Sequence, residues 1–359
     1  MTLATDLSGG RPIAHPGAWQ ASDYPTADSL STSLSATEID AVQTLGREVR
    51  GRSESPEAVD PGGLDFAGLG ERGLRWRQEV IDGSGFLLLR GLPESMSDED
   101  YTAVFWALGG LFGPAVSQSN MGDRIGHVVN VGGDDFRERA YRNRRELSMH
   151  TDRCDVVGMM CLQPAFEGGL SSYASALALY NHIAKTRPEL VEPLTRGFYY
   201  HRFGEQASNE PGITRARVPI ISAADNAVSV VYLRAYIEMA AKENDQPLTE
   251  REREALDVFD ALANSDEFKV NMMLGRGDIV FFNNCTMLHK RSAFEDKPEE
   301  APRRHLLRLW LMTPDRPRID ALRAYKRDGI EVKTGGNTYY RGASLVTPDQ
   351  YTRSGEDAG

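Results

Sequence analysis

Apolar residues near the start of the chain recur at helical spacing behind polar capping residues. Ser35 and Glu38 form a capping-box pattern, and apolar side chains follow at intervals of three or four residues over 39–49, which predicts an amphipathic helix. Two further segments have helical patterns with a stop signal or a cap, 72–81 and 97–108. The run 85–90 follows a glycine and is apolar but too short for a helix, so it predicts a buried strand.

Beyond residue 126 the pattern changes to short apolar runs separated by turn residues. These runs predict strands at 127–131, 156–162, 171–174, 197–201, 218–222, 228–233, 268–274, 278–282 and 304–312. Helical patterns interrupt them at 175–185 and at 249–263. Many short strands with regular turns are typical of a sandwich or jelly roll, so we expect a mainly β fold with peripheral helices.

The two ends of the chain differ from its body. Residues 1–33 are rich in Ser, Thr, Gly and Pro without periodicity, and 334–359 form a polar tail, so we expect both ends to be poorly ordered or to lie over the surface of the body. We expect a single large domain over 34–333. Two independent domains are the alternative, since the chain has 359 residues.

Composition excludes several classes of partner. The chain has 41 basic and 52 acidic residues, a net charge of −11, and no basic run of five, so we expect no nucleic acid partner. Its apolar runs are far shorter than the roughly 20 residues of a bilayer helix, so we expect no membrane span. The first residues lack the features of a secretory signal, which favours a cytoplasmic protein. The three cysteines show no CxxC spacing, which argues against a disulfide framework or a thiolate zinc site.

One histidine of the seven has a carboxylate at ligand spacing. His150 and Asp152 are two residues apart, so in an extended segment they point the same way and could bind one metal ion together. The composition gives about one such pair by chance, so a surface His–Asp pair is the alternative. A third ligand is available in His289, where an apolar strand that starts after Gly277 has run into a polar turn. A structural role is the alternative for this histidine.

The strand at 304–312 carries arginines within an apolar sequence. Strand periodicity places Arg304, Leu306, Arg308 and Trp310 on one face, while the other face is mostly leucine. Because two buried arginines are costly without counter-charges, they require anions. Internal salt bridges are the alternative to a bound ligand.

Together these elements resemble the taurine/2-oxoglutarate dioxygenase family of non-haem iron enzymes. The resemblance covers about 85–312 and follows the family order of parts: the His-x-Asp motif, the glycine pair before Ser171, a helical insert, the distal histidine, and Arg304 fifteen residues after it. It implies a double-stranded β-helix, a jelly-roll variant. It also implies that His150, Asp152 and His289 bind Fe(II).

The physical chemistry agrees with the roles that the resemblance implies. Two imidazoles and a carboxylate leave three positions open on an octahedral ion, enough for 2-oxoglutarate and O2. Arg304 would receive the distal carboxylate of 2-oxoglutarate by a bidentate pair. Ser171 stands where relatives often have a threonine hydroxyl, and it keeps that hydroxyl. Because the third ligand is Asp152 rather than Gly or Ala, no position is vacant for a halide and radical halogenation is disfavoured.

The resemblance also gives a clue to the substrate. In relatives that act on sulfonates, an arginine four residues after the cosubstrate arginine binds the substrate anion, and Arg308 has that position. The alternative is that Arg308 supports 2-oxoglutarate or an internal carboxylate.

We therefore expect an Fe(II)/2-oxoglutarate-dependent dioxygenase that hydroxylates an unactivated C–H bond and releases succinate and CO2. Its substrate would be a small anionic molecule, either amino-acid-like or a carboxylate or sulfonate. Desaturation, epoxidation and cyclisation stay open, as does a homo-oligomer. The rival hypotheses are a metal-dependent hydrolase that uses the same ligands, which leaves Arg304 without a role, and a non-catalytic jelly-roll binding protein.

Overall fold

The computed structural model describes residues 7–119, 121–130, 144–296, 303–326 and 328–332. The polar tail that we expect at 334–359 lies outside the described residues. None of the described helices is long and apolar enough to cross a membrane.

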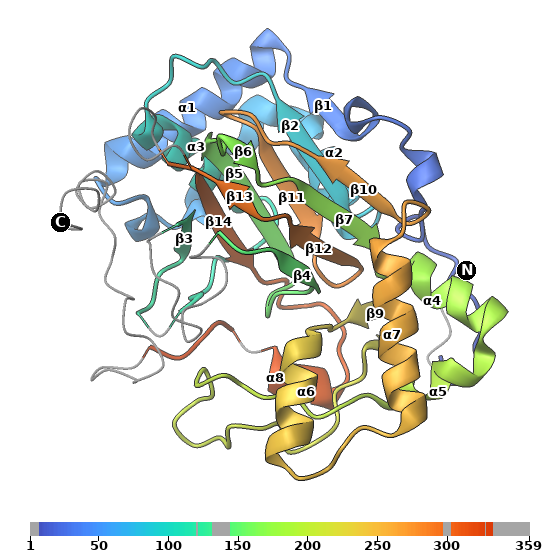
Figure 1. Ribbon diagram of the computed structural model, residues 1–359. Coiled ribbons are helices and arrows are strands. Elements are labelled where there is room, and N and C mark those ends of the chain that lie inside the picture. The colour runs from blue at the N-terminus through green and yellow to red at the C-terminus, as the bar shows by residue number, and fades with distance from the viewer. Residues whose placement is uncertain (1–6, 120, 131–143, 297–302, 327, 333–359) are drawn as a thin grey trace, which may run out of the picture.

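Two β-sheets form the centre of the molecule (Figure 1). The six-stranded sheet has the order β1 (Ser31–Ser33), β2 (Phe86–Arg90), β11 (Ile279–Asn283), β5 (Val156–Gln163), β14 (His305–Leu311) and β3 (Ile125–Val129). The four-stranded sheet has the order β10 (Lys269–Met272), β7 (Ser171–Ser175), β12 (Met287–Arg291) and β4 (Leu147–His150). Neighbouring strands are antiparallel except β1 and β2, which are parallel. Two strand pairs complete the described sheets: β6 (Glu167–Gly168) with β13 (Phe294–Glu295), and β8 (Ile221–Ala224) with β9 (Ala227–Val230).

The two larger sheets face each other across one hydrophobic cluster. Phe86 and Phe282 of the six-stranded sheet contact Tyr173 of the four-stranded sheet, with ring centroids 4.9 and 5.2 Å apart. Leu306 and Trp310 belong to the same cluster. Period-2 alternation therefore points one face of β14 into the space between the sheets, as the sequence predicts.

Three helices cover the outer face of the six-stranded sheet (Figure 1): α1 (Ala36–Arg52), α2 (Gly70–Ile81) and α3 (Asp98–Gly109). Ser35 and Ser97 cap α1 and α3 through their side-chain oxygens, which confirms both predicted starts. The leucines on the outer face of β14 pack in the same cluster as these helices. Short 3-10 helices connect the elements at Ala21–Asp23, Ala27–Leu30, Pro56–Ala58, Pro61–Gly63, Phe66–Leu69 and Pro188–Leu190.

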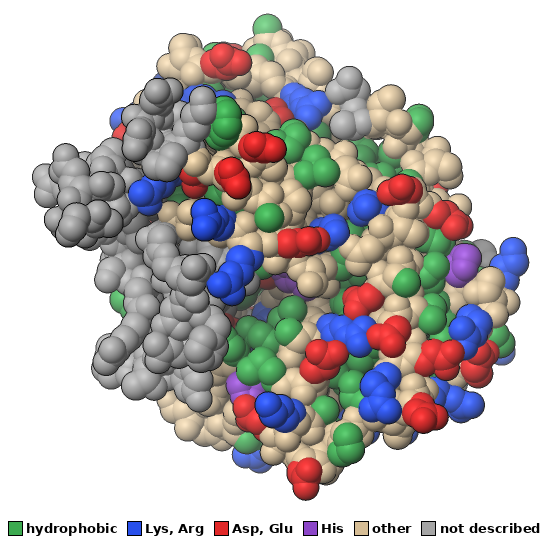
Figure 2. Space-filling view, in the orientation of Figure 1, with side chains coloured by type: hydrophobic (Ala, Val, Ile, Leu, Met, Phe, Trp, Pro, Cys, Tyr) green, Lys and Arg blue, Asp and Glu red, His purple; other side chains and the backbone are tan. Residues whose placement is uncertain are grey.

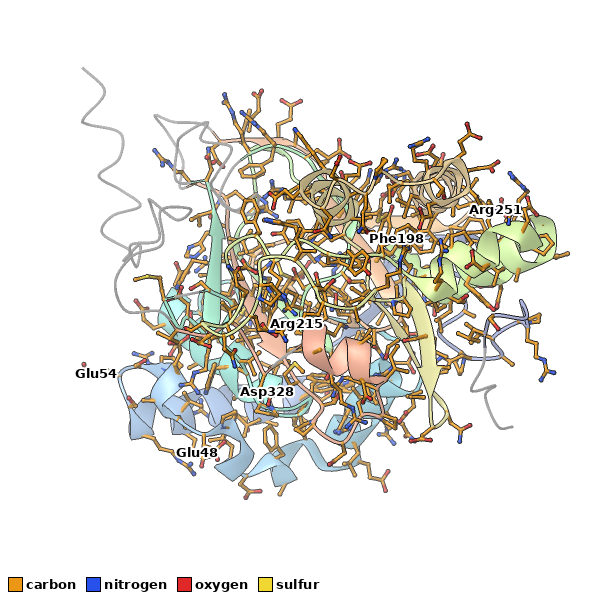
Figure 3. All side chains as sticks on the ribbon, turned by 90° about the horizontal axis from the view of Figure 1, so that it is seen from below. Glu48, Glu54, Phe198, Arg215, Arg251 and Asp328 are labelled. Atoms are coloured by element: carbon orange, nitrogen blue, oxygen red, sulfur yellow. The ribbon has the colours of Figure 1, made fainter. Side chains whose placement is uncertain are left out.

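A second group of helices surrounds the end of the four-stranded sheet: α4 (Ala176–Thr186), α5 (Val191–Arg196), α6 (Arg234–Glu243), α7 (Glu250–Asn264) and α8 (Asp320–Tyr325). They share a core in which Phe198 is buried, whereas Arg251 on α7 points outward (Figure 3). In the described part of the chain the α-helices contain more residues than the strands. The expectation of a mainly β fold is therefore correct for the centre of the molecule but not for its residue content.

The N-terminal segment differs from its expectation. Within 7–33, Leu7, Ile13 and Trp19 are buried, and β1 pairs with β2. The indole N–H of Trp19 donates a hydrogen bond to the carbonyl of Ser84 at 2.9 Å. Its few apolar residues are spaced irregularly and fit cavities on the folded body, which no periodicity could show.

One predicted strand is wrong, and several elements are absent from the predictions. Residues 197–201 form only isolated bridges, from Phe198 to Val218 and from His201 to Ile213. The sequence pattern missed β4 and β12, which carry two of the expected ligands. β4 alternates apolar and polar residues but has only four residues, and β12 has two apolar residues followed by three polar or basic ones, so neither has an apolar pattern long enough to mark a strand.

Candidate active site

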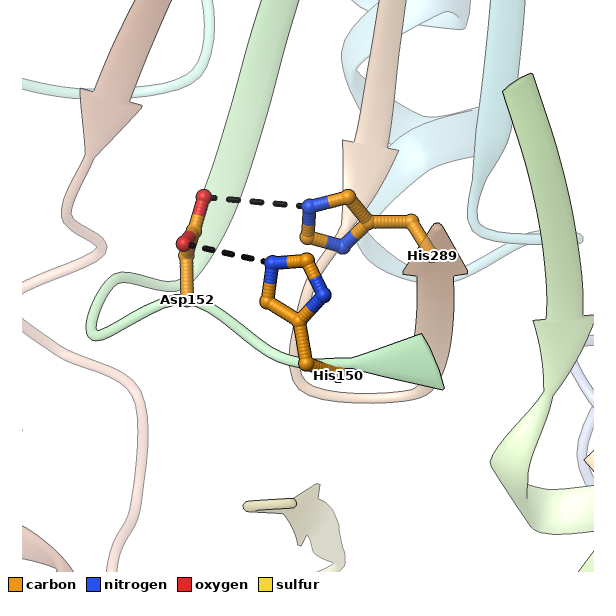
Figure 4. Close-up of side chains that lie close together, drawn as sticks. All are labelled: His150, Asp152 and His289. Atoms are coloured by element: carbon orange, nitrogen blue, oxygen red, sulfur yellow. Dashed lines mark ion pairs between the residues drawn. The ribbon is translucent and has the colours of Figure 1, made fainter. Parts of the chain in front are cut away.

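The two strands missing from the predictions bring the three expected metal ligands together. β12 runs antiparallel to β4 with His289 directly opposite His150, and Asp152 follows two residues after β4 ends. Nε2 of His150 lies 3.8 Å from Oδ1 of Asp152, and Nε2 of His289 lies 3.8 Å from Oδ2 (Figure 4). In the described residues this is the one group of three His, Cys, Asp or Glu side chains close enough to bind a metal ion.

The surroundings of His150 and His289 favour imidazole forms that can bind a cation. Nδ1 of His150 lies 2.8 Å from the carbonyl oxygen of Ser148, and a carbonyl only accepts, so Nδ1 carries the proton and Nε2 presents its lone pair. Burial, followed by the neighbouring His150, lowers the pKa of His289 to about 3, so its ring is neutral at physiological pH. Neutral imidazole nitrogens and a carboxylate suit Fe(II).

The Asp152 carboxylate is fixed by donors from β14. Trp310 Nε1 donates to Oδ2 at 2.9 Å, and Arg308 Nη1 donates to the same oxygen at 3.2 Å. Because Oδ2 accepts both bonds, Oδ1 is the oxygen better placed to bind a metal. Burial alone would raise the pKa of Asp152, but the charges of Arg308 and the two histidines hold it well below its usual range.

The Asp152 backbone is held as well. Asn284, which precedes β12, accepts from the Asp152 N–H at 2.9 Å and donates to the Asp152 and Cys154 carbonyls at 2.8 and 2.6 Å. This amide thus fixes the loop that carries the ligand. No spacing rule in the sequence points to Asn284.

A cavity of about 600 Å³ opens next to these ligands. Figure 2 shows this face hollowed near its centre, with a histidine visible at depth. The residues of the cavity wall include His150, Asp152, Arg308, Trp310, Phe203, Tyr236 and Tyr325. The site is therefore open to a small molecule from one side.

Arg304 lies between the sheets as a buried cation. Its side chain is 3 % exposed, and Nη1 has no hydrogen-bond partner in the described part of the chain. Burial lowers its pKa to about 10, while Cys161, Asp296 and Tyr173 act in the opposite direction. Among the described residues Arg304 forms no ion pair with a carboxylate within 4.0 Å. A guanidinium left in this state fits a ligand carboxylate.

Ser171 lies on the same face of β7 as Tyr173, whose hydroxyl it hydrogen-bonds. In the pairing of β7 with β12, Tyr173 is opposite His289 and Ser171 is opposite Arg291. The Ser171 hydroxyl therefore lies one step along the sheet from the metal ligand, on the side where Arg304 approaches.

Neighbouring atoms leave no room for a side chain at the two glycines before Ser171, Gly168 and Gly169. A Cβ on Gly168 would lie 2.3 Å from the carbonyl oxygen of Ala293, and a Cβ on Gly169 would lie 3.0 Å from Nε of Arg304. Both glycines also have positive φ angles, 73° and 72°. Gly169 thus leaves the space that Arg304 occupies.

Replacing Gly169 by alanine should displace Arg304 and weaken 2-oxoglutarate binding several-fold. The strained φ should also destabilise the protein by about 1–2 kcal/mol. A cosubstrate titration and a thermal denaturation curve measure the two effects. Gly51→Ala on α1 is the matched control, because nothing lies within 4 Å of its added Cβ. Unchanged cosubstrate affinity in Gly169→Ala would contradict this account.

The structure thus brings together His150, Asp152 and His289, and places Arg308 beside them. Arg308 contacts an internal carboxylate, which was the alternative considered for it, and it also lines the cavity. Sequence reasoning missed four residues around the site: Tyr173, Asn284, Arg291 and Gln118, whose Oε1 accepts a hydrogen bond from Nε of Arg308 at 2.7 Å. Of these, Arg291 could have been found from the sequence, because it lies two residues after His289 and hence on the same face of a strand.

Comparison with known proteins identifies the family. The model of the "Taurine catabolism dioxygenase TauD, TfdA family" matches residues 49–310. This chain belongs to the TauD/TfdA family. FR-33289 synthase of Streptomyces rubellomurinus is 30% identical over 241 residues, covering 65% of this chain and 70% of that protein. Taurine hydroxylase-like protein SAT17 of Stachybotrys chartarum is 26% identical over 306 residues, covering 81% and 77%.

Solved structures agree on the fold. Asparagine oxygenase in complex with Fe(II), 2S,3S-3-hydroxyasparagine and succinate superimposes with a TM-score of 0.60 at 17% identity, covering 79% of this chain and 94% of that one. As a TauD/TfdA member the protein is a 2-oxoglutarate-dependent non-haem iron dioxygenase that uses Fe(II), 2-oxoglutarate and O2. Family membership removes the two rival hypotheses, the hydrolase and the binding protein.

Proposed function

We propose that this dioxygenase hydroxylates an unactivated C–H bond of a small anionic substrate, with release of succinate and CO2. In this proposal His150, Asp152 and His289 hold the iron, and Arg304 with Ser171 holds the distal carboxylate of 2-oxoglutarate. The facing sheets form a double-stranded β-helix within a single domain over 34–333. The observation that carries the proposal is the His–Asp–His cluster at the wall of a cavity that Arg308 also lines.

Bound Fe(II) and 2-oxoglutarate, with O2, supply the oxidant that breaks the C–H bond. The residues of the chain bind and orient the metal, the cosubstrate and the substrate, and they exclude water from the site. Trp310 and Arg308 donate to Oδ2 of Asp152, so that Oδ1 of this carboxylate would hold the metal together with His150 and His289. The apolar cluster between the sheets keeps water from the cosubstrate end.

The charges at the centre of the site favour an anionic substrate. In this proposal the bound cation, Arg304 and Arg308 are the positive groups nearest the metal position, and Arg308 also lines the cavity. These charges would attract an acidic group on the substrate. The asparagine oxygenase complex contains a hydroxylated amino acid, which carries such a carboxylate. This supports an amino-acid-like substrate for the present chain.

An anaerobic titration tests the proposal most directly. Adding Fe(II) and then 2-oxoglutarate to the metal-free protein should give a weak visible charge-transfer band, because that band requires both to chelate one metal. Admitting O2 should then convert 2-oxoglutarate to succinate. Absence of the band at saturating cosubstrate would contradict the proposed site.

Arg308→Gln should raise the substrate KM by about tenfold or more and increase the succinate formed per hydroxylated product. The reason is that the lost anchor positions the reacting C–H bond as well as binding it. Because Arg308 also donates to Oδ2 of Asp152, substrate-free decarboxylation should fall as well, but less than product formation. The measurement needs paired succinate and product assays over a panel of acidic and neutral amino acids and sulfonates. A neutral compound as the best substrate would remove the anionic-substrate part of the proposal.

A further inference from the structure

A second buried arginine lies at the cosubstrate end of the site. Arg291 is 5 % exposed and is the last residue of β12. We propose that Arg291 supplies a second positive charge for the distal carboxylate of 2-oxoglutarate, beside Arg304. This inference rests on the proposed function, which assigns that carboxylate to Arg304.

The register of the four-stranded sheet places Arg291 inside the site. It lies two residues after His289 on β12, so both side chains project from the same face. Its partner on β7 is Ser171, and the partner of His289 is Tyr173, which is buried between the two sheets. The side chains of Arg291 and Ser171 therefore share the face that meets the six-stranded sheet.

One aromatic ring joins the two arginines. The guanidinium carbon of Arg291 lies 4.7 Å from the centroid of the Phe294 ring, and that of Arg304 lies 5.0 Å from it. Phe294 itself is buried. Arg291 comes from the four-stranded sheet and Arg304 from the segment entering β14 of the six-stranded sheet, so two guanidinium groups meet in one buried place.

The two guanidinium groups lie close enough to influence each other. The positive charge of Arg304, after burial, disfavours the charged form of Arg291. Asp296 is the acidic side chain that acts on both arginines, and its Oδ1 accepts a hydrogen bond from the backbone N–H of Arg304. A ligand carboxylate bound by Arg304 would therefore lie close to the guanidinium group of Arg291 as well, and each group could donate to it.

A structural role is the competing explanation. Nη2 of Arg291 donates to the carbonyl of Arg145, just before β4, so Arg291 also ties down the approach to the His150 strand. Loss of this contact would disturb the iron site in general. A carboxylate contact, by contrast, would matter only for a cosubstrate that has the distal carboxylate.

The test compares two 2-oxo acids that differ in that group. Dissociation constants of 2-oxoglutarate and 2-oxopentanoate, which lacks the distal carboxylate, are measured anaerobically from the charge-transfer band with Fe(II). Arg291→Gln should raise the dissociation constant of 2-oxoglutarate by about tenfold. It should leave the dissociation constant of 2-oxopentanoate unchanged. Arg291→Lys keeps the charge, so it should recover part of the lost affinity for 2-oxoglutarate.

Arg276→Gln is the matched control. Arg276 is a partly buried arginine that stacks on Tyr101 and hydrogen-bonds the carbonyls of Leu162 and Met96 rather than the groups around Phe294, so its substitution should change neither constant. Equal weakening of both acids in Arg291→Gln, or no weakening of either, would overturn the inference. If the glutamine variant does not fold, the lysine variant decides, because it should still weaken 2-oxoglutarate selectively. Absence of a band in the unchanged protein would instead refute the proposed function.

Discussion

His289→Ala should reduce iron retention at least about 100-fold and abolish succinate formation. Loss of second-layer partners of metal ligands already costs 10- to 100-fold in affinity, and removal of a ligand should cost more. The two remaining groups, His150 and Asp152, cannot define three facial positions. Iron content after gel filtration and succinate release with 2-oxoglutarate are the two measurements.

His182→Ala is the matched control for this variant, because His182 lies on α4 against Phe268 and away from the cluster. It should retain iron and turnover. Asp152→Ala should lose hydroxylation even if some iron still binds, and it should also destabilise the fold by about 3–5 kcal/mol, since Arg308 would keep a buried charge without its carboxylate. Unchanged turnover in His289→Ala would remove the triad from the account.

Arg304→Ala should weaken 2-oxoglutarate binding by roughly 30-fold or more. Loss of a charge-assisted contact to a buried carboxylate costs about 2 to 5 kcal/mol. Iron content and the folded state should survive, because Arg304 does not contact the ligand cluster. A titration of 2-oxoglutarate into the Fe(II)-loaded protein without O2 measures the effect.

The neighbouring Arg303 provides the control for that titration. Its Nη1 reaches the carbonyl of Asn130 at 3.4 Å, away from the space between the sheets. Arg303→Ala should therefore bind 2-oxoglutarate as the unchanged protein does. An unaltered dissociation constant in Arg304→Ala would mean that another cation holds the distal carboxylate.

Local patterns predicted the elements whose apolar residues are periodic. The helix starts at Ser35, Ser97 and Thr249 are confirmed, since a side-chain cap acts within one turn and is visible in sequence. The strands β4 and β12 were missed because β4 has only four residues and β12 ends in three polar or basic residues. The sheet nevertheless forms there, because its antiparallel partners supply the backbone hydrogen bonds.

The candidate ligands themselves could be read from the sequence. Residue type and spacing were enough for His150 and Asp152, and the order of the later motifs added His289 and Arg304. The face of β14 that carries Arg304 and Arg308 also followed from alternation alone, because successive side chains of a strand point to opposite sides. Chemistry that depends on identity, order and period is thus set by the sequence by itself.

The tertiary structure decided how these groups meet. Arg308 and Trp310 reach Asp152 across 156 and 158 positions of the chain, and Arg291 meets Arg304 over the ring of Phe294. Such contacts depend on how the two sheets are placed face to face, and packing between distant segments leaves no periodic trace in either one. The sequence therefore determined which groups are available for catalysis, whereas the packing of the sheets decided which oxygen of Asp152 is already occupied and where the buried guanidinium groups of Arg291 and Arg304 meet.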